Sequence, residues 1–293
     1  MKVFFDPACR DHDPPGHPEC PARLDWALRG VGPRGEMETA PAAQLEDLTG
    51  LHSAGALARL QGKPGYLDAG ETYLGADSLR AALTSAGLAR AAAHSALSGE
   101  GPALSLGRPP GHHASFDSQM GFCLVNSVAF AARSAISTVE RVAIVDFDVH
   151  HGNGTQDIFY GDPAVLYVSV HQWPLYPGTG ATSERGEGRG EGATVNVPLP
   201  PGCGDADYAA VFDEVVLRAL AVHSPDLLLV SAGYDAHRRD PLAQMELTGA
   251  GFGLISARLL GHGAPTAFIL EGGYDPLGLA EGVAATLEAM ERG

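Results

Sequence analysis

The chain alternates short apolar runs with longer segments in which apolar residues recur at helical spacing. The short runs predict strands near residues 2–5, 102–106, 142–147, 164–170, 194–198, 226–232 and 266–270. The longer Ala- and Leu-rich segments predict helices near residues 22–29, 76–98, 124–137, 206–223, 248–261 and 277–290. Strands that alternate with helices predict an α/β fold, in which a mainly parallel sheet carries helices on both faces.

Three of the predicted strands, "VAIVDF", "DLLLV" and "TAFIL", are almost continuously apolar, as expected of strands that are covered on both faces. The chain has 293 residues, of which 45% are hydrophobic, so it can form one large core. It contains no repeat and no linker between domains, and we expect a single domain over residues 1–293. The Gly-rich segment 178–192 has no long apolar face and predicts an exposed loop.

Composition and charge exclude several classes of protein. A formal net charge of −16 argues against nucleic-acid binding, because phosphate contacts need clustered Lys and Arg. This charge would instead attract a cationic substrate, although acidity also serves solubility. The four cysteines form no C-x-x-C pair, which favours reduced thiols. The N-terminal "MKVFFDPACR" is too poor in apolar residues to be a signal or membrane segment, so we expect a cytoplasmic protein.

Four of the predicted strands run directly into polar, chemically reactive sequence. The strand at 102–106 leads to "GRPPGHHA", and the strand at 142–147 leads to "DVHHGNG". The strand at 226–232 is followed by "GYDAH", and the strand at 266–270 by "EGGYD". Ligands of open parallel sheets bind beyond the carboxyl ends of the strands. Four such endings from distant parts of the chain therefore predict one functional site.

One of these endings, in "VAIVDFDVHHGNG", predicts a metal site. Side chains alternate along a strand, so Asp146, Asp148 and His150 share a face. Asp148 and His150, joined by Asp235 from another strand end, form an oxygen, nitrogen and oxygen set that suits a divalent metal with open positions. A cation would compensate the burial of these charges, which otherwise costs roughly several kcal/mol per charge. Any one of these residues alone would more often be a cap, an ion-pair partner or a core histidine.

The other strand ends supply groups for proton transfer. His112 and His113 are adjacent imidazoles after a Pro-Pro turn, and Asp146 and Asn153 are available to fix a histidine tautomer. Tyr274 follows two glycines, and we expect a flexible "EGG" lead-in that lets the phenol close over a developing oxyanion. The alternative is that Tyr274 only fills space within a loop, as an ordinary packing residue.

These segments and their order resemble the histone deacetylase family, specifically its class II-like branch of bacterial deacetylases and acetylpolyamine amidohydrolases. The resemblance covers nearly the whole chain, through "HPECPARL", "RPPGHHA", "MGFCLVNSVAFAA", "VDFDVHHGNGTQDIFY", "VSVHQWPLYPGTG", "NVPLPPG", "SAGYDAHRRDPL" and "LEGGYD". It implies the arginase-like three-layer α/β/α fold with an eight-stranded parallel sheet, and zinc-dependent hydrolysis of acetyl-amine amides.

The resemblance implies cation sites of two kinds. The divalent site would hold zinc, or ferrous iron, on Asp148, His150 and Asp235. A structural potassium ion nearby would bind Asp146, Ser169 and the backbone oxygens of Asp148, His150 and Val170. A second, more peripheral monovalent site would use the backbone near Phe159, Asp162 and Val165.

The resemblance also implies the groups that act in catalysis. His112 and His113 would be the tandem acid/base pair, and Tyr274 would be the oxyanion donor. Asp146 would support His112, and Asn153 would support His113. Because Asn153 is neutral, it should leave His113 less readily protonated than a carboxylate would.

A substrate tunnel for an acylated lysine is implied as well. Phe122, preceded by Gly121, and Tyr176 fall where the family places its two aromatic walls. Tyr176 replaces a common phenylalanine and adds a hydroxyl, which is expected to affect acyl preference. Polyamine deacetylases carry an acidic gatekeeper at the rim position that is Leu242 here, so Leu242 favours acyl-lysine. The acidic "PEC" at 18–20 and the net charge favour a polyamine.

The remaining histidines are expected to lie outside the reacting groups. His151 matches the family motif but should point away from the metal, so we interpret it as structural. His171 follows a strand, where it can contact a residue that supports the site. Five histidines have no partner pattern and are expected on the surface: His12, His52, His94, His223 and His262.

The sequence therefore favours an amidohydrolase that removes acetyl or short acyl groups from an acylated lysine peptide or protein. An acetylpolyamine amidohydrolase, a binuclear metal ureohydrolase and a non-catalytic acyl-lysine-binding protein stay as alternatives. The ureohydrolase would need more carboxylate ligands, and the non-catalytic protein is expected to have lost a ligand or Tyr274. Nothing in the sequence indicates the oligomeric state.

Overall fold

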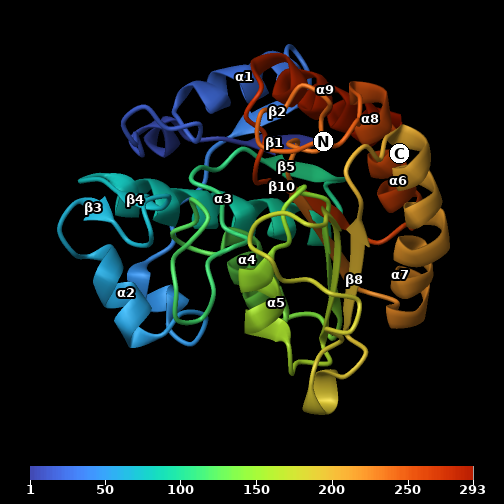
Figure 1. Ribbon diagram of the computed structural model, residues 1–293, viewed down its shortest axis with the longest axis horizontal. Coiled ribbons are helices and arrows are strands. Elements are labelled where there is room, and N and C mark those ends of the chain that lie inside the picture. The colour runs from blue at the N-terminus through green and yellow to red at the C-terminus, as the bar shows by residue number, and fades with distance from the viewer. Residues whose placement is uncertain (293) are drawn as a thin grey trace.

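An eight-stranded sheet forms the centre of the computed structural model, which describes residues 1–292 (Figure 1). Its strands are β1 (Lys2–Phe4), β2 (Glu36–Glu38), β5 (Ala103–Ser105), β6 (Val142–Asp146), β7 (Val165–Gln172), β8 (Thr194–Leu199), β9 (Leu227–Ala232) and β10 (Thr266–Leu270). They lie side by side in the order β2, β1, β5, β10, β9, β6, β7, β8, and every neighbouring pair is parallel. This confirms the predicted parallel sheet.

Helices pack on both sides of the sheet, which confirms the predicted α/β/α arrangement. One group packs against the strands and comprises α3 (Ser78–Leu97), α4 (Ser127–Ala135) and α5 (Asn153–Phe159). A second group gathers at the other side and comprises α1 (Ala22–Val31), α8 (Gly249–Gly261) and α9 (Pro276–Arg292) (Figure 1). The remaining helices are α2 (Ala54–Leu60), α6 (Asp205–Val211) and α7 (Leu217–His223).

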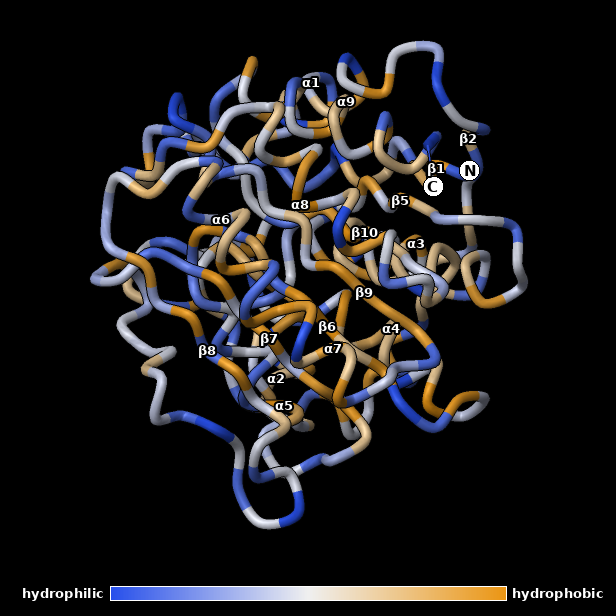
Figure 2. The backbone as a smooth tube through the Cα atoms, turned by 90° about the vertical axis from the view of Figure 1, so that its right-hand side faces the viewer, coloured by the Kyte–Doolittle hydropathy of each residue, from blue (hydrophilic) through white to orange (hydrophobic). Residues whose placement is uncertain are grey.

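The central strands are buried along their whole length. Every residue of β5, β6, β7, β9 and β10 is buried, as predicted for strands that are covered on both faces. Figure 2 shows the apolar stretches of β6, β7 and β9 passing through the middle of the molecule. Removing this apolar surface from water stabilises the fold by about 25 cal/mol per Å². None of the helices in residues 1–292 combines the length and the apolar character that a membrane crossing requires.

The apolar pattern of the sequence did not predict several features of the structure. Strand β2 has the sequence Glu-Met-Glu at the edge of the sheet and is largely exposed, so it has no apolar signature. Strands β3 (Gly65–Tyr66) and β4 (Tyr73–Leu74) form a short antiparallel pair. The predicted helix at 206–223 is confirmed as one continuous helical stretch, in which the π-helical segment Phe212–Val216 joins α6 to α7. The predicted loop at 178–192 is largely exposed, although Gly180, Gly186 and Gly190 are buried within it.

The order of the strands explains how distant segments of the chain reach one site. Strands β5, β10, β9 and β6 are consecutive neighbours in the sheet. These are the four strands whose carboxyl ends lead into the polar segments. Because parallel strands end at the same edge, the four segments meet above the middle of the sheet.

Candidate active site

Asp148, His150 and Asp235 meet at the carboxyl ends of β6 and β9. Nδ1 of His150 lies 3.1 Å from Oδ1 of Asp148 and 3.1 Å from Oδ2 of Asp235. The ligand atoms of all three lie within 4.8 Å of one another. A Cβ on Gly272 would lie 2.1 Å from Oδ2 of Asp235, so this position must be glycine for the carboxylate to fit. The cluster can hold a divalent cation.

Backbone hydrogen bonds orient the two carboxylates. The N–H of Gly272 donates to Oδ2 of Asp148 at 2.8 Å, and the N–H of Val149 donates to Oδ1 of Asp235 at 2.9 Å. Burial favours the neutral imidazole of His150, but its hydrogen bonds to both carboxylates outweigh this and raise its pKa to about 10. Burial and the charge of Asp148 raise the pKa of Asp235 to about 6. The donor set thus fits a divalent cation, which would take the place of these protons.

His112 and His113 lie side by side with ring centroids 4.0 Å apart, and each has its own partner. Nδ1 of His112 lies 3.0 Å from Oδ2 of Asp146, and Nδ1 of His113 lies 2.8 Å from Oδ1 of Asn153. Burial opposes protonation of His112, but the charges of Asp148 and Asp146 raise its pKa well above 6.5. Burial, together with the charges of His112 and His150, lowers the pKa of His113 well below 6.5. One imidazole is therefore set to hold a proton and the other to accept one.

Tyr274 lies at the same cavity and is held on two sides. The guanidinium of Arg23 lies 4.7 Å from the centre of its ring, and the ring of Phe122 meets it edge-on at 5.8 Å. Burial raises the pKa of the Tyr274 phenol well above 10, although the charge of Arg23 opposes this. The phenol therefore keeps its proton and can donate a hydrogen bond.

The expectation of a flexible "EGG" lead-in to Tyr274 is wrong. Arg23 donates from Nη2 to the carbonyl oxygen of Glu271, and from Nε to that of Gly273 at 2.8 Å. The carbonyl oxygen of Gly272 accepts a hydrogen bond of 3.0 Å from the N–H of Tyr234. The glycines serve close packing rather than motion, because their backbone groups are bonded to the surrounding core.

A cavity of about 190 Å³ joins these groups to solvent. Its lining comprises Glu71, His112, His113, Gly121, Phe122, His150, Leu175, Tyr176, Leu242 and Tyr274. The residues predicted for a substrate tunnel, Gly121, Phe122, Tyr176 and Leu242, all belong to it. A Cβ on Gly121 would lie 2.4 Å from the His113 ring, and Gly121 also has a φ of +55°, so both space and backbone require glycine there.

The acidic segment at 18–20 does not face this cavity, so its expected contribution to substrate binding is wrong. Glu19 is fully buried. It accepts hydrogen bonds from Nε of Arg108 at 2.5 Å and from Nη1 of Arg23 at 3.0 Å. Burial raises the pKa of Glu19, but the charges and hydrogen bonds of Arg108 and His12 together outweigh this and hold it well below 4.5. Glu19 is a partner of core arginines rather than a residue of the rim.

His151 and His171 lie beside the site without contacting the proposed metal ligands. The ring nitrogens of His151 lie 2.7 Å from the hydroxyl of Thr179 and 3.0 Å from Oε1 of Gln156. Nδ1 of His171 lies 2.9 Å from the hydroxyl of Ser169. The two rings are 4.9 Å apart, and burial lowers the pKa of His151 to about 4. Both are therefore neutral packing residues.

The predicted surface location is wrong for two of the five other histidines. His12 and His52 are buried. Nδ1 of His12 lies 2.7 Å from the hydroxyl of Ser78, and Nδ1 of His52 lies 2.8 Å from the carbonyl oxygen of Ser115. Their partners are more than 60 residues away along the chain, so local sequence contains no sign of them. His94 is exposed, and His223 and His262 are half-buried.

Asp240 is a site residue that the sequence interpretation missed. Its carboxylate is buried and accepts from the N–H of Tyr274 at 2.7 Å and from the N–H of Leu242 at 2.9 Å. Burial and the charge of Asp235 raise its pKa to about 7. Its only sequence signal is its place in "RRDPL", shortly after Asp235.

The residues predicted to bind monovalent cations also lie near strand ends. Asp146 is paired in register with Ser169 of β7 and with Ser231 of β9, and the hydroxyl of Ser231 has no hydrogen-bond partner in the described chain. At the end of α5, the carbonyl oxygen of Phe159 accepts from the N–H of Asp162 at 3.0 Å. The N–H of Val165 in turn donates to the carbonyl oxygen of Asp162 at 3.3 Å.

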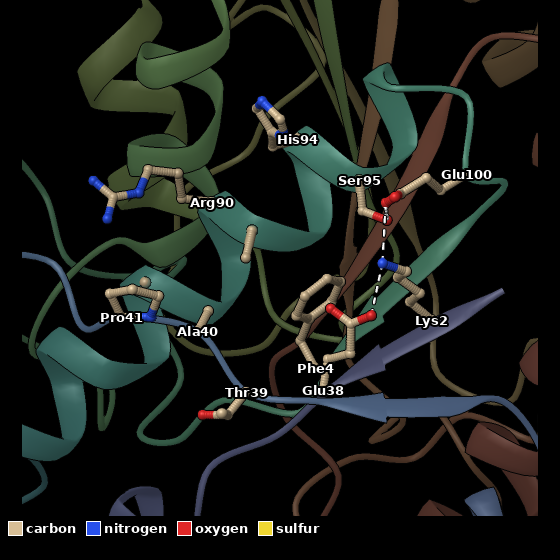
Figure 3. A pocket seen from close by; sticks show the side chains of 12 residues that line it. Lys2, Phe4, Glu38, Thr39, Ala40, Pro41, Arg90, His94, Ser95 and Glu100 are labelled. Carbon is tan, nitrogen blue, oxygen red and sulfur yellow. Dashed lines mark hydrogen bonds and ion pairs between the residues drawn. The ribbon is translucent and has the colours of Figure 1, made fainter.

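A larger cavity of about 410 Å³ lies between β1, β2 and α3 (Figure 3). None of the predicted site residues lines it. Nζ of Lys2 forms ion pairs with Glu38 at 2.6 Å and Glu100 at 3.2 Å, and Ser95 donates to Glu100 at 2.9 Å. These polar groups pair with one another. The lining of this cavity therefore differs from that of the candidate active site, where reactive side chains converge.

The fold and the site define an α/β protein with a polar centre, able to hold a cation, at the carboxyl edge of a parallel sheet. Residues 17–290 match the family model described as the histone deacetylase domain. The chain belongs to the histone deacetylase family. This membership supports a hydrolase activity.

Known proteins resemble the chain along most of its length. Histone deacetylase 10, chloroplastic, from Oryza sativa subsp. japonica is 43% identical over 256 residues, which cover 83% of this chain and 58% of the rice protein. The crystal structure of the HDA15 HD domain has a TM-score of 0.94 and 36% identity, covering 99% of this chain and 87% of that one. That of acetylpolyamine aminohydrolase from Burkholderia pseudomallei has a TM-score of 0.93 and 30% identity, covering 99% and 98%.

Proposed function

We propose that the protein is a zinc-dependent amidohydrolase that removes acetyl or short acyl groups from the acylated lysine of a peptide or protein. The observation that carries the proposal is that His150 of the cation cluster, the histidine pair and Tyr274 line one cavity. In this assignment Asp148, His150 and Asp235 hold the metal, with ferrous iron as the alternative to zinc. Phe122 and Tyr176 flank the lysine stem.

The side chains divide the chemistry of amide hydrolysis among them. Zinc, when bound, polarises the carbonyl and lowers the pKa of a water toward about 7. The neutral His113 accepts a proton from the attacking water, and Asn153 fixes its tautomer through Nδ1. The Tyr274 hydroxyl donates to the oxygen on which negative charge develops. His112, which the charges of Asp148 and Asp146 keep protonated, supplies a proton to the departing amine.

The proposal extends to the surroundings of this centre. A structural potassium ion would bind Asp146, Ser169 and the backbone oxygens of Asp148, His150 and Val170. The register that places Asp146 beside Ser169 supports this assignment. A second monovalent ion would use the backbone of Phe159, Asp162 and Val165.

We also propose that residues 1–293 form one deacetylase domain that acts in the cytoplasm.

An acetylpolyamine amidohydrolase is the second candidate. The neighbouring structure from Burkholderia pseudomallei is named for that activity, and Glu71 is one of the residues that line the cavity. Leu242 favours acyl-lysine, because it offers only apolar contact at the cavity mouth. A non-catalytic acyl-lysine-binding protein is less well supported, since every proposed reacting group is present.

The proposal is tested by steady-state kinetics on the metal-loaded protein. The substrates are an acetyl-lysine peptide, a trifluoroacetyl-lysine peptide, N-acetylputrescine and N8-acetylspermidine. We expect a higher kcat/KM for the two acyl-lysine peptides than for the polyamines. A clearly higher kcat/KM for either polyamine would favour the second candidate, and no hydrolysis of any substrate would contradict the enzyme assignment.

A further inference from the structure

Glu271 lies directly after β10 and reaches the turn that carries the two adjacent histidines. Only 1% of the residue is exposed. Oε2 of Glu271 accepts hydrogen bonds from two consecutive backbone groups, the N–H of Gly111 at 2.6 Å and the N–H of His112 at 3.1 Å. This carboxyl group therefore connects the carboxyl end of β10 with the segment that follows β5.

The backbone of Glu271 is itself held by two neighbours. Its N–H donates to the carbonyl oxygen of Ala232, the last residue of β9, at 3.1 Å. Its carbonyl oxygen accepts a hydrogen bond from Nη2 of Arg23, which belongs to α1. Both neighbours are buried. The position of the carboxyl group is thus set by β9 and α1, independently of the histidine turn.

The rest of the turn is bonded to other parts of the core. The N–H of Ala114 donates to the carbonyl oxygen of Gly111 at 2.9 Å, and the N–H of Thr155 donates to that of His112 at 3.0 Å. A Cβ on Gly111 would lie 2.6 Å from the backbone nitrogen of Ser127, so the turn passes close to the start of α4. Glu271 supplies the acceptor for the two N–H groups with which this turn begins.

The surroundings of Glu271 favour a neutral carboxyl group. Its other oxygen, Oε1, has no hydrogen-bond partner among residues 1–292. Burial raises the pKa of Glu271 to about 7, although the charge of His112 and the hydrogen bond from Gly111 oppose this. The thiol of Cys123 lies in the same cluster and stays protonated, because burial raises its pKa well above 9. The two N–H groups need an acceptor oxygen, which a neutral carboxyl group also provides.

We propose that Glu271 is a positioning residue for the histidine pair, which it holds by accepting hydrogen bonds from the backbone of Gly111 and His112. The inference rests on the proposed function, in which His112 supplies a proton to the amine and His113 accepts one from water. Both imidazoles belong to this one turn, so a shift of the turn moves them together relative to Tyr274. The hydrogen bonds of Glu271 end on backbone groups, so it acts through the placement of the turn.

The test separates the acceptor oxygen of Glu271 from its charge. Glu271→Gln keeps one acceptor oxygen and removes the charge, whereas Glu271→Leu removes both. Glu140→Leu is the matched control, because the side chain of Glu140 is 90% exposed. Metal content, kcat and KM for an acetyl-lysine peptide are measured on the metal-loaded proteins, well below their melting temperatures. Hydrogen exchange of the backbone amides of Gly111 and His112 is measured without substrate.

In Glu271→Leu we expect kcat to fall about ten- to a hundredfold, with KM changed less than about twofold, as for misplaced reacting groups. The amides of Gly111 and His112 should exchange faster in this variant, because they have lost their acceptor. Glu271→Gln should keep kcat within about threefold of the wild type and keep the slow exchange. Metal content should be the same in all four proteins. A purely structural role would lower the melting temperature of Glu271→Leu and leave its kcat unchanged.

Two results would overturn the inference. The first is a wild-type kcat or an unchanged amide exchange in Glu271→Leu, which would show that the turn is held without the carboxyl group. The second is an equal loss of kcat in Glu271→Gln and Glu271→Leu, which would show that the charge of Glu271 acts rather than its oxygen. Failure of the proposed function is distinguishable, because the wild type would then not hydrolyse the peptide, whereas the exchange measurement needs no activity.

Discussion

The backbone N–H of Tyr274 donates a 2.7 Å hydrogen bond to Oδ2 of the buried Asp240. The other oxygen of Asp240 accepts from the N–H of Leu242 at 2.9 Å. One carboxylate therefore fixes both the proposed oxyanion donor and a residue of the cavity mouth. Arg23 lies over the Tyr274 ring at 4.7 Å and completes the support. The phenol is in place before a substrate arrives, which avoids a reorganisation cost during the reaction.

This relationship predicts the behaviour of Asp240→Asn. The amide keeps one acceptor oxygen but presents an NH₂ group in place of the other, so one of the two hydrogen bonds is lost. Because a small misplacement of a reacting group is costly, we expect kcat to fall about ten- to a hundredfold, with KM changed less. Metal content, measured by elemental analysis, should equal that of the wild type. A kcat equal to that of the exposed control Asp213→Asn would contradict the positioning role.

Tyr274→Phe removes the hydroxyl and keeps the ring that packs against Arg23 and Phe122. Losing one oxyanion donor lowers turnover by about 10²–10³, which corresponds to roughly 3–4 kcal/mol. We expect a loss of this size in kcat for an acetyl-lysine peptide, with unchanged metal content and melting temperature. Near-normal turnover would rule out the proposed role of the Tyr274 hydroxyl.

The pH dependence follows from His113, which is proposed to accept the proton. Burial and the charges of His112 and His150 lower the pKa of His113 well below 6.5. A base acts only when neutral, so activity should be lost as the pH falls through this lowered pKa. We therefore expect the acidic limb of the kcat/KM profile to lie below pH 6.5.

Asn153→Asp tests this assignment, because position 153 contacts Nδ1 of His113 at 2.8 Å. A carboxylate there favours the protonated imidazole and raises the pKa of His113. The acidic limb of the kcat/KM profile should move to higher pH in the variant. An unmoved limb would show that another group sets it.

Leu242→Glu probes substrate class at the cavity mouth. A second carboxylate there would bind a distant ammonium, which an apolar side chain cannot do. The general acidity of the protein is screened over about 8–10 Å at physiological salt, so it cannot supply such selectivity. We expect kcat/KM to fall for a neutral acetyl-lysine peptide and to rise for N8-acetylspermidine. Leu242→Gln is the uncharged control, and equal changes in both variants would exclude an effect of charge.

The polar strand ends could be predicted because each follows a short, mainly apolar run. Asp148 and Tyr274 are far apart in the sequence, yet both follow strands of a parallel sheet, which places them at one edge. The sequence pattern did not contain the order of the strands. That order brings β5, β10, β9 and β6 together and is set by packing between distant elements.

Other features depend on partners that the sequence does not reveal. The acidic segment at 18–20 was expected to favour a polyamine substrate, whereas Glu19 pairs with Arg108, which is 89 residues away along the chain. Asp240 and Glu71 were given no role in the sequence analysis, because the first acts through backbone N–H groups and the second occupies a short hairpin. Neither kind of contact produces a periodic pattern of apolar residues, so neither could be predicted from the sequence.

The proposed function requires one divalent metal on Asp148, His150 and Asp235 for amide hydrolysis. The most direct test is elemental analysis of the wild type and Asp235→Ala, with the hydrolysis of an acetyl-lysine peptide measured on the same samples. Asp213→Ala is the matched control, because it removes an exposed carboxylate that pairs with Arg258. We predict one equivalent of zinc or iron and full activity in the wild type and the control, and loss of both in Asp235→Ala. A full equivalent of metal in Asp235→Ala, or undiminished hydrolysis by metal-free wild type, would contradict the account.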